Sequence, residues 1–356
     1  MELFYCKSPL PNFGDDMNAW FWDEIFPDFR TLAPGRTMFG IGSILWRANV
    51  EMFDDIVVMG SGTGVGILPD RFPDATLFQF VRGPRTAREF GLGADRAVSD
   101  PACCTPLLPG MEPPRAPHGD PIFVPHAGTG ALPLDWARVA DGAGLRLVSP
   151  SGDSRAVIRE IAGARLVVTE SMHGAILADA YRVPWIAVAI KPNFCSFKWL
   201  DWADSVEVDD LRIHSVLDGA KRAYAALRSA GRWPRDMRAR LGAPDPQDRP
   251  IRFARTDALS QGQEYRINGA EKHRLRKRAA RFAGTLEWLV ARQLRQVAQS
   301  RPRLSDDRVL ADRQRRVFAR IAETRALLTT AAKPADGADA ARRPTRPDPF
   351  PDDAHR

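Results

Sequence analysis

A short polar turn, Glu170-Ser171-Met172-His173, carries the strongest chemical signal in the sequence. It follows the apolar run at 166–169 and precedes a stretch with helical spacing. Free amides and the helix dipole at a helix start favour a bound anion and disfavour a charged imidazolium, so His173 is predicted to stay near neutrality. We predict that His173 transfers a proton beside a phosphate, that Glu170 accepts a hydroxyl proton and that Ser171 lines the same site. The alternative is that His173 only caps the helix or packs under the turn.

Two arginines occupy an equivalent position earlier in the chain. Arg82 ends the run TLFQFV, and Pro84 suits the first position of the helix that follows. A guanidinium fork matches a carboxylate or phosphate in bidentate fashion, so Arg82 and Arg85 are predicted to bind an anionic substrate. The alternative is an ordinary salt bridge from Arg82 to Asp100 or Glu89.

Two isolated polar residues could serve the same site. His126 closes the run PIFVP, and Lys198 lies in an aromatic run that follows the last strand-like segment. We treat both as candidate substrate ligands, with a packing role as the alternative. The neighbouring Phe197, Trp199 and Trp202 could stack on a sugar, although aromatics at such positions more often form core.

The glycine-rich segment at 60–66, GSGTGVG, follows the strand-like run IVVM. It lacks the dinucleotide-binding pattern, because Val65 and Ile67 stand where that pattern needs glycine, and no Gly-Lys-Ser/Thr follows as in a phosphate-binding loop. Backbone without side chains can still approach a ligand closely, so Gly62 and Gly64 are predicted to contact substrate. The alternative is a plain turn from strand to loop.

The elements that must position these residues alternate along the first two hundred residues. Apolar runs that read as strands are separated by runs with helical spacing, which predicts an α/β fold with a mainly parallel sheet. Candidate helix caps are Asp15, Ser171 and either Ser151 or Asp153. The predicted strands are ELFYC, DIVVMGS, TLFQFVRG, PIFVPH, LRLVSP, RLVVTES and PWIAVAI, and the predicted helices are DDMNAWFWDEIF, PRTAREFG, SRAVIREIAGA and MHGAILADAYR.

A Pro- and Gly-rich stretch from Pro106 to Pro121 interrupts this alternation and is interpreted as a linker. It predicts one α/β domain over 1–113 and a second, which carries His173, over 114–250. Ligands would bind between the carboxyl ends of the two sets of strands. After Asp201 no strand is expected, and the chain is helix-like from about Leu211. The prediction continues with a basic helical extension over 251–332 and a disordered tail over 333–356.

Charge, apolar runs and cysteine spacing argue against several classes of protein. The net charge is +7, and the excess of Lys and Arg between residues 251 and 330 exceeds that of the whole chain. No apolar run reaches the roughly 18 residues of a membrane-spanning helix and no signal peptide is recognised, so a cytoplasmic protein is expected. The four cysteines show no metal-ligand spacing, and no metal site is predicted. A nucleic-acid-binding protein would use the basic segment, but no reading element accompanies the charge and no nucleic acid is expected.

Eight motifs in order resemble the polysaccharide pyruvyl transferase family, and particularly its exopolysaccharide branch of succinoglycan-type ketal-forming enzymes. They are NFGDDMN, GIGSIL, VMGSGTG, VRGPRTAREFGL, SDPA, FVPH, TESMHGAILADAYRVPWIAV and FKWLDW, and together they span about residues 1–205. The resemblance implies a fold like the GT-B glycosyltransferases, with two Rossmann-like domains facing a cleft.

The resemblance also implies a bacterial transferase that uses phosphoenolpyruvate as co-substrate, with no cofactor, and a lipid-linked oligosaccharide as acceptor. His173 matches the essential histidine of the family, and Arg82 the arginine expected to hold the donor. Many relatives carry an arginine one or two places before that histidine, where this chain has Ser171 and Met172. Donor binding is therefore assigned to Arg82, Arg85, His126 or Lys198, and metal dependence stays open. The competing function is a nucleotide-sugar glycosyltransferase on the same architecture.

A basic amphipathic stretch at 272–297 could connect the enzyme to a lipid-linked acceptor. Its apolar positions fall on one side at helical spacing, and its other face is crowded with arginine. Such a helix can lie on anionic lipid, which would place the protein peripherally at the inner face of the membrane. The alternative is that the apolar stripe packs onto the α/β core. The stripe consists of Leu275, Phe282, Leu286, Leu289, Val290, Leu294 and Val297.

Overall fold

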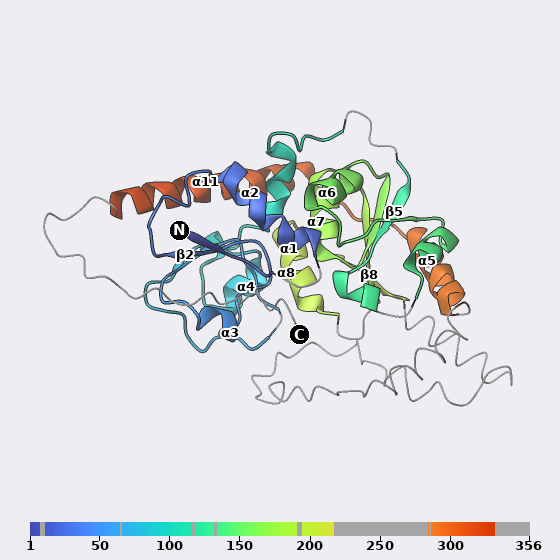
Figure 1. Ribbon diagram of the computed structural model, residues 1–356, viewed down its shortest axis with the longest axis horizontal. Helices are drawn as coiled ribbons and strands as arrows, with labels where there is room; N and C mark the ends of the chain where they lie inside the picture. Colours follow the sequence, from blue (N-terminus) through green and yellow to red (C-terminus); the bar gives the residue numbers. More distant parts are fainter. Residues whose placement is uncertain are drawn as a thin grey trace, which may run out of the picture.

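The structure is a computed structural model that describes residues 1–7, 11–64, 66–114, 119–131, 134–190, 194–216, 284 and 286–331. Two parallel sheets lie side by side and helices cover them (Figure 1). The first sheet has the order β1-β2-β3-β4 and the second β6-β5-β7-β8-β9. The strands are β1 Glu2–Phe4, β2 Thr37–Phe39, β3 Ile56–Met59, β4 Leu77–Phe80, β5 Pro121–Val124, β6 Arg146–Leu147, β7 Leu166–Thr169, β8 Trp185–Ala189 and β9 Ile213–Ser215.

The predicted α/β class with parallel sheets is confirmed, since every strand pair within the two sheets is parallel. Strands such as β3 (IVVM) and β8 (WIAVA) are buried along their whole length, which explains their continuous apolar sequence. Two strands were missed. The segment TMF of β2 is too short to show a pattern, and β9, whose residues are only half-buried, contradicts the expectation of no strand after Asp201.

Local sequence explains how the helices begin. Asp153 caps α6, Ser171 caps α7 and Pro84 is the first residue of α4, as predicted. The cap of α1 is Asn12 rather than Asp15, because the Asn12 side chain accepts from the Gly14 amide. The helices are α1 Phe13–Asp16, α2 Asn18–Ile25, α3 Arg47–Val50, α4 Pro84–Glu89, α5 Trp136–Gly142, α6 Ser154–Ala162, α7 Met172–Ala180, α8 Ser196–Ser205 and α11 Asp307–Ala331, with 3₁₀ helices η1 Ala94–Arg96, η2 Pro101–Leu107 and η3 Ala127–Ala131.

The stretch interpreted as a linker is ordered and buried over its first part. Pro106 is buried inside the 3₁₀ helix η2, and Leu108 and Met111 belong to the main hydrophobic core. That core includes residues near both sheets, for example Val57 of β3 and Trp185 of β8. Residue 114 falls between the last strand of the first sheet and the first strand of the second. The predicted domain boundaries stay predictions.

The C-terminal helices pack against the two sheets rather than apart from them. Residues 286–298 are helical, and Val290, Leu294 and Val297 join a cluster with β5, β7 and β8. The apolar stripe predicted to meet lipid thus packs onto the core where it is described, while Leu275 and Phe282 lie outside the described residues. So do residues 251–283 of the predicted basic extension and the whole tail at 333–356.

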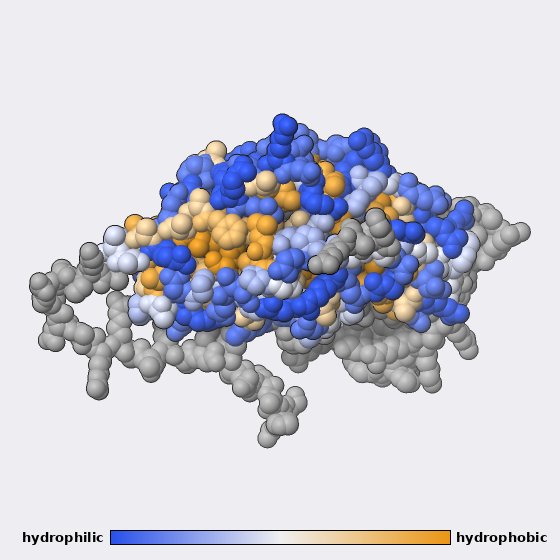
Figure 2. Space-filling model, turned by 90° about the horizontal axis from the view of Figure 1, so that it is seen from above, coloured by the Kyte–Doolittle hydropathy of each residue, from blue (hydrophilic) through white to orange (hydrophobic). Residues whose placement is uncertain are grey.

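The long helix α11 runs beside α2 along the first sheet (Figure 1). It buries Val317, Ile321 and two leucines, and Arg325 reaches back to Asp28 at 2.7 Å. Seen from the side on which α11 lies, Figure 2 shows an apolar area among hydrophilic residues; α11 itself leaves Phe318 and Leu327 exposed. Among the helices that the structure describes, none combines the length and apolar character needed to cross a bilayer.

Candidate active site

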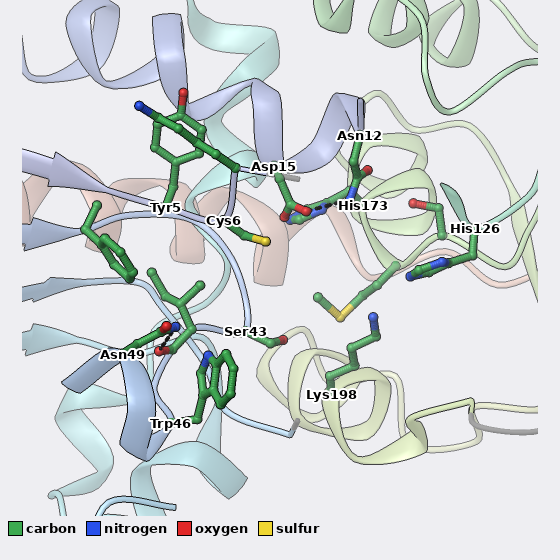
Figure 3. Close-up of a pocket in the computed structure, with 15 residues that line it drawn as sticks. Tyr5, Cys6, Asn12, Asp15, Ser43, Trp46, Asn49, His126, His173 and Lys198 are labelled. Atoms are coloured by element: carbon green, nitrogen blue, oxygen red, sulfur yellow. Dashed lines mark hydrogen bonds between the residues drawn. The ribbon is translucent and has the colours of Figure 1, made fainter. Parts of the chain in front are cut away.

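A pocket of about 320 Å³ lies where the carboxyl ends of strands from both sheets meet. This is within the range of ~300–1,000 Å³ typical of small-molecule sites. Tyr5 follows β1, Ser43 follows β2, His126 follows β5 and His173 follows β7, so the pocket draws on strand ends of both sheets (Figure 3). The full lining is Phe4, Tyr5, Cys6, Lys7, Asn12, Asp15, Ser43, Ile44, Trp46, Asn49, His126, Ser171, Met172, His173 and Lys198.

His173 occupies the first turn of α7 beside α1. Its side chain is 8% exposed, and Nε2 lies 3.8 Å from Oδ2 of the buried Asp100. Burial, followed by the positive charges of nearby residues, lowers the pKa of His173 to about 3, so the ring is neutral at physiological pH. A Cβ at Gly14 would collide with the ring at Nδ1, so glycine at this position lets α1 pack directly against the imidazole. Figure 3 shows His173 beside Asn12 and Asp15, which flank Gly14.

Lys198 and His126 face the same part of the pocket from the second sheet's side (Figure 3). Burial lowers the pKa of Lys198, and among the described residues no hydrogen bond or salt bridge to its ammonium is seen. The Nδ1 atom of His126 accepts from the Gly128 amide at 3.1 Å, which fixes the orientation of the ring. Across from them Asp15 is held by Asn12 at 2.6 Å, and burial raises the pKa of this carboxyl to about 6. Lys198 and His126 make their side of the pocket suited to a small anion.

The opposite side of the pocket is aromatic. Tyr5 and Trp46 lie on that side in Figure 3, away from Lys198 and His126. Gly66, in a left-handed conformation, packs against the Trp46 ring, and Asn49 is anchored by a 3.0 Å hydrogen bond to the Ile44 carbonyl. Partly exposed aromatic rings beside an amide side chain are suited to a sugar, whose apolar face stacks while its hydroxyls hydrogen-bond.

Arg82 does not line this pocket. It is completely buried, and each nitrogen of its guanidinium donates a hydrogen bond: Nε to Asp201 at 3.0 Å, Nη1 to Ser43 at 2.6 Å and Nη2 to the Thr63 carbonyl at 2.5 Å. The salt-bridge alternative named Asp100 or Glu89, and the partner is instead Asp201 of α8. Arg82 thus stands one layer behind the pocket wall, where it supports Ser43. Its assignment as a donor ligand stays a prediction.

Arg85 and Glu170 also point elsewhere. Arg85 pairs with Asp204 of α8 at 2.7 Å. The Glu170 carboxylate is buried and accepts from the His126 amide at 3.2 Å, from the Ile190 amide at 3.0 Å and from the Thr129 hydroxyl. Glu170 therefore ties together the ends of β5, β7 and β8, a role that orients His126. Its proposed part in accepting a hydroxyl proton stays a prediction.

The glycine-rich loop has a packing role. The Gly62 amide donates to the Gly42 carbonyl at 2.9 Å, and a Cβ at Gly62 would collide with the guanidinium of Arg82. Gly64 has φ +132°, and its carbonyl accepts from the Cys195 thiol at 2.6 Å. Neither glycine is among the residues that line the pocket. Phe197, Trp199 and Trp202 are buried in the core, so the sugar-stacking role considered for them is wrong.

Of the predicted site residues, the structure brings His173, Ser171, His126 and Lys198 together in one pocket. Sequence reasoning missed its first-sheet wall, including Tyr5, Asp15, Ser43 and Trp46. The segments NFGDD and GIGS belong to this wall, but neither motif by itself indicates a particular chemistry. Within the described residues no group of three or more His, Cys, Asp or Glu side chains could hold a metal ion.

Comparison with known proteins agrees with the motif resemblance. The profile of the family described as polysaccharide pyruvyl transferase matches residues 77–192, which include β4, β5, β7 and α7. The succinoglycan biosynthesis protein ExoV of Rhizobium meliloti (strain 1021) is 37% identical over 318 residues, which cover 89% of this chain and 96% of that protein. No solved structure matches the chain. With a parallel α/β fold, a strand-end pocket around His173 and a relative that is similar over nearly its whole length, the chain belongs to the polysaccharide pyruvyl transferase family and is a transferase.

Proposed function

We propose that this enzyme transfers the pyruvyl unit of phosphoenolpyruvate, as a cyclic ketal, onto a sugar of a lipid-linked exopolysaccharide repeat unit. The observation that carries the proposal is that one pocket holds Lys198, His126 and the buried His173 on one side and Tyr5 and Trp46 on the other. A small dianionic donor fits the first and a sugar the second. The family and the succinoglycan-linked relative support pyruvyl transfer onto an exopolysaccharide.

The donor end is built to hold phosphate and carboxylate groups. Lys198 presents an ammonium without a salt bridge among the described residues, and burial makes that ammonium costly to leave unpaired. A bound anion would stabilise the charged form. His126, oriented through its Nδ1, presents its other ring nitrogen to the same space. The amide at the α7 start adds the positive end of a helix dipole beside His173.

The chemistry follows from the donor. A proton from His173 adds to the vinyl carbon and converts it to a methyl group, so the central carbon becomes electrophilic. One sugar hydroxyl attacks this carbon, phosphate leaves with the electron pair of its C–O bond, and a second hydroxyl closes the ketal. The two hydroxyl protons balance the proton delivered to carbon and the proton taken by phosphate. Lys198 stabilises charge as it collects on the leaving phosphate.

The acceptor end would orient the sugar for this attack. Trp46 and Tyr5 stack on its apolar face, and Asn49 and Ser43 hydrogen-bond its hydroxyls. Ser43 is itself fixed by the buried Arg82.

We further propose that the two sheets form Rossmann-like halves in a GT-B-like arrangement. We also propose that a lipid-linked acceptor brings the cytoplasmic enzyme to the inner face of the membrane.

The test combines donor binding with product analysis. Phosphoenolpyruvate should raise the melting temperature of the enzyme, whereas a sugar nucleotide should not. Incubation with lipid-linked oligosaccharide extracts should add the mass of pyruvic acid less one water, with one inorganic phosphate released per ketal. Protection by a sugar nucleotide alone, with transfer of a sugar residue, would establish the glycosyltransferase alternative instead.

A further inference from the structure

Two buried polar atoms face each other behind the pocket wall, and neither has a hydrogen-bond partner in the described part of the chain. They are Nε2 of His173 and Oδ2 of Asp100, 3.8 Å apart. Buried polar atoms are almost always hydrogen-bonded, so an unpaired pair at this separation calls for an explanation. A small rotation of either side chain would bring the two atoms within hydrogen-bond distance.

Asp100 is placed so that only this oxygen is available. It precedes η2, and its Oδ1 accepts from the Ala102 amide at 3.0 Å as a helix cap. The carboxyl group is fully buried. On the other side of the imidazole, Nδ1 lies beside Gly14. In the sequence Gly14 falls between Asn12 and Asp15, which both line the pocket. The ring, which lines the pocket, thus has Nε2 toward the Asp100 carboxyl and Nδ1 toward Gly14 of α1.

We infer that Asp100 and His173 act as one proton-holding pair, in which the proton given to the substrate from Nδ1 is replaced through Nε2 by the proton of the Asp100 carboxyl. In the loaded state Asp100 is a carboxylic acid that donates to Nε2, and the neutral ring carries its own proton on Nδ1. The inference rests on the proposed function for its substrate, and on the two unpaired atoms for its geometry.

The transfer balances without an imidazolium ion in either resting state. The Nδ1–H bond breaks as a C–H bond forms on the vinyl carbon of phosphoenolpyruvate. The Asp100 O–H bond breaks as Nε2–H forms, which leaves a carboxylate and the other neutral tautomer of the ring. A hydroxyl proton of the attacking sugar can reload the pair by the reverse path. Asp100 acts through His173 and is a positioning and proton-supplying residue rather than one that touches substrate.

The shifted pKa values agree with this arrangement. Burial raises the pKa of Asp100 to about 6 and lowers that of His173 to about 3, so the shared proton belongs to the carboxyl rather than to the ring. The pair is loaded below about pH 6 and loses its proton as the pH rises, so acid catalysis falls in that direction unless a bound anion raises the pKa. The charged and titratable groups around the pair are Asp15 of α1, Arg82 after β4, His126 after β5, and Lys198 and Asp201 of α8.

The tautomer of His173 can be read directly in the full-length, ligand-free protein. Long-range proton–nitrogen NMR with ¹⁵N-labelled histidine distinguishes the two neutral tautomers from the imidazolium, and the spectrum of His173→Gln assigns the signal among the six histidines. We expect the Nδ1–H tautomer at low pH and a switch to the Nε2–H tautomer as the pH rises. A ring that becomes doubly protonated between pH 5 and 8, or keeps one tautomer throughout, would overturn the inference.

Asp100→Asn supplies the matched kinetic test. The asparagine keeps an oxygen for the Ala102 amide and an N–H for Nε2, so the cap and the ring orientation are retained while the transferable proton is lost. Single-turnover transfer should fall by about 10²-fold or more, and the NMR tautomer switch should disappear. Asp179→Asn is the control, since Asp179 is equally buried in α7 but bonds Ser305. This control should lower the melting temperature and leave the pH profile unchanged.

The outcomes separate this inference from the proposed function. If the tautomer switch is seen but phosphoenolpyruvate neither raises the melting temperature nor donates pyruvate, the Asp100–His173 pair is supported and phosphoenolpyruvate is excluded as the donor. Pyruvyl transfer by a protein without the switch, or an Asp100→Asn variant with the wild-type rate and pH profile, would retain the function and reject the pair.

Discussion

The turn after β4 and the turn after β7 look alike in sequence and differ in the structure. Each places a polar residue after a parallel strand and at a helix start: Arg82 lies two residues before α4, and His173 lies in the first turn of α7. His173 reaches the pocket, whereas Arg82 is covered by α8, whose Asp201 lies 119 positions further along the chain. A strand end determines at which edge of a sheet a residue lies. What covers that edge is decided by a distant segment.

The largest effect is expected at the turn that reaches the pocket. His173→Gln should lower phosphate release from phosphoenolpyruvate by about 10²–10⁴-fold, because the amide cannot supply a proton. The melting temperature should stay within a few degrees of wild type. If the variant keeps its activity but its melting temperature falls sharply, His173 has a packing role, and the turn after β7 would then be as structural as the turn after β4.

Two glycines offer a matched comparison. Gly14 contacts the His173 ring, and Gly83 contacts the backbone carbonyl of Asp201 in α8. In Gly14→Ala the new methyl group must displace the ring, so we expect a loss of transfer of about 10²-fold with modest destabilisation. Gly83→Ala should separate α4 from α8 and chiefly lower stability, which thermal unfolding measures. Equal effects of both substitutions on both quantities would contradict the comparison.

Lys198 tests whether the anion site lies at the pocket rather than at Arg82. Lys198→Gln should raise the KM for phosphoenolpyruvate about 10- to 100-fold, since hydrogen bonds to charged groups contribute roughly 1.5–3 kcal/mol. Stability should be unchanged or higher, because burial already disfavours the lysine's charge. An unchanged donor KM would exclude Lys198 from donor binding.

The substitution Arg82→Lys tests the role of the turn after β4, which α8 covers. An ammonium cannot reach Asp201, Ser43 and the Thr63 carbonyl together, so we expect a loss of about 1–3 kcal/mol in the free energy of unfolding, measured with denaturant. The donor KM should change less than it does in Lys198→Gln. The reverse balance, a large rise in donor KM at unchanged stability, would return Arg82 to the donor site.

The smallest effect is expected at the aromatic end. Trp46→Phe retains an aromatic ring of smaller area, so the acceptor KM should rise only several-fold, in keeping with about 0.5–1.5 kcal/mol for aromatic contacts. Steady-state kinetics at saturating phosphoenolpyruvate measure this, with the donor KM as internal control. A rise in the donor KM instead would place Trp46 at the other end of the pocket.

The sequence predicted the features that depend on local residues and missed those that depend on contacts between distant segments. Local signals located the caps at Asp153 and Ser171 and the strands with continuous apolar runs. The short strands β2 and β9 have no such signal, because their neighbours in the sheet rather than their own residues determine their conformation. The same holds for the site: His173 could be found from its turn, but the partners of Arg82 and Glu170 depend on packing between distant elements.

The position of α11 also affects how the first sheet folds while the chain is being synthesised. Its buried residues close the core beside the first sheet, where Thr324 contacts Met59 and Gln314 bonds the Cys103 carbonyl at 2.8 Å. Synthesis at roughly 5–20 residues per second separates the end of β4 at Phe80 from the start of α11 at Asp307 by about 10–45 s. During that interval the nascent first sheet lacks its covering helix and exposes apolar surface. Truncation before α11 would make that exposure permanent, so we expect a chain that lacks this helix to aggregate through its N-terminal sheet.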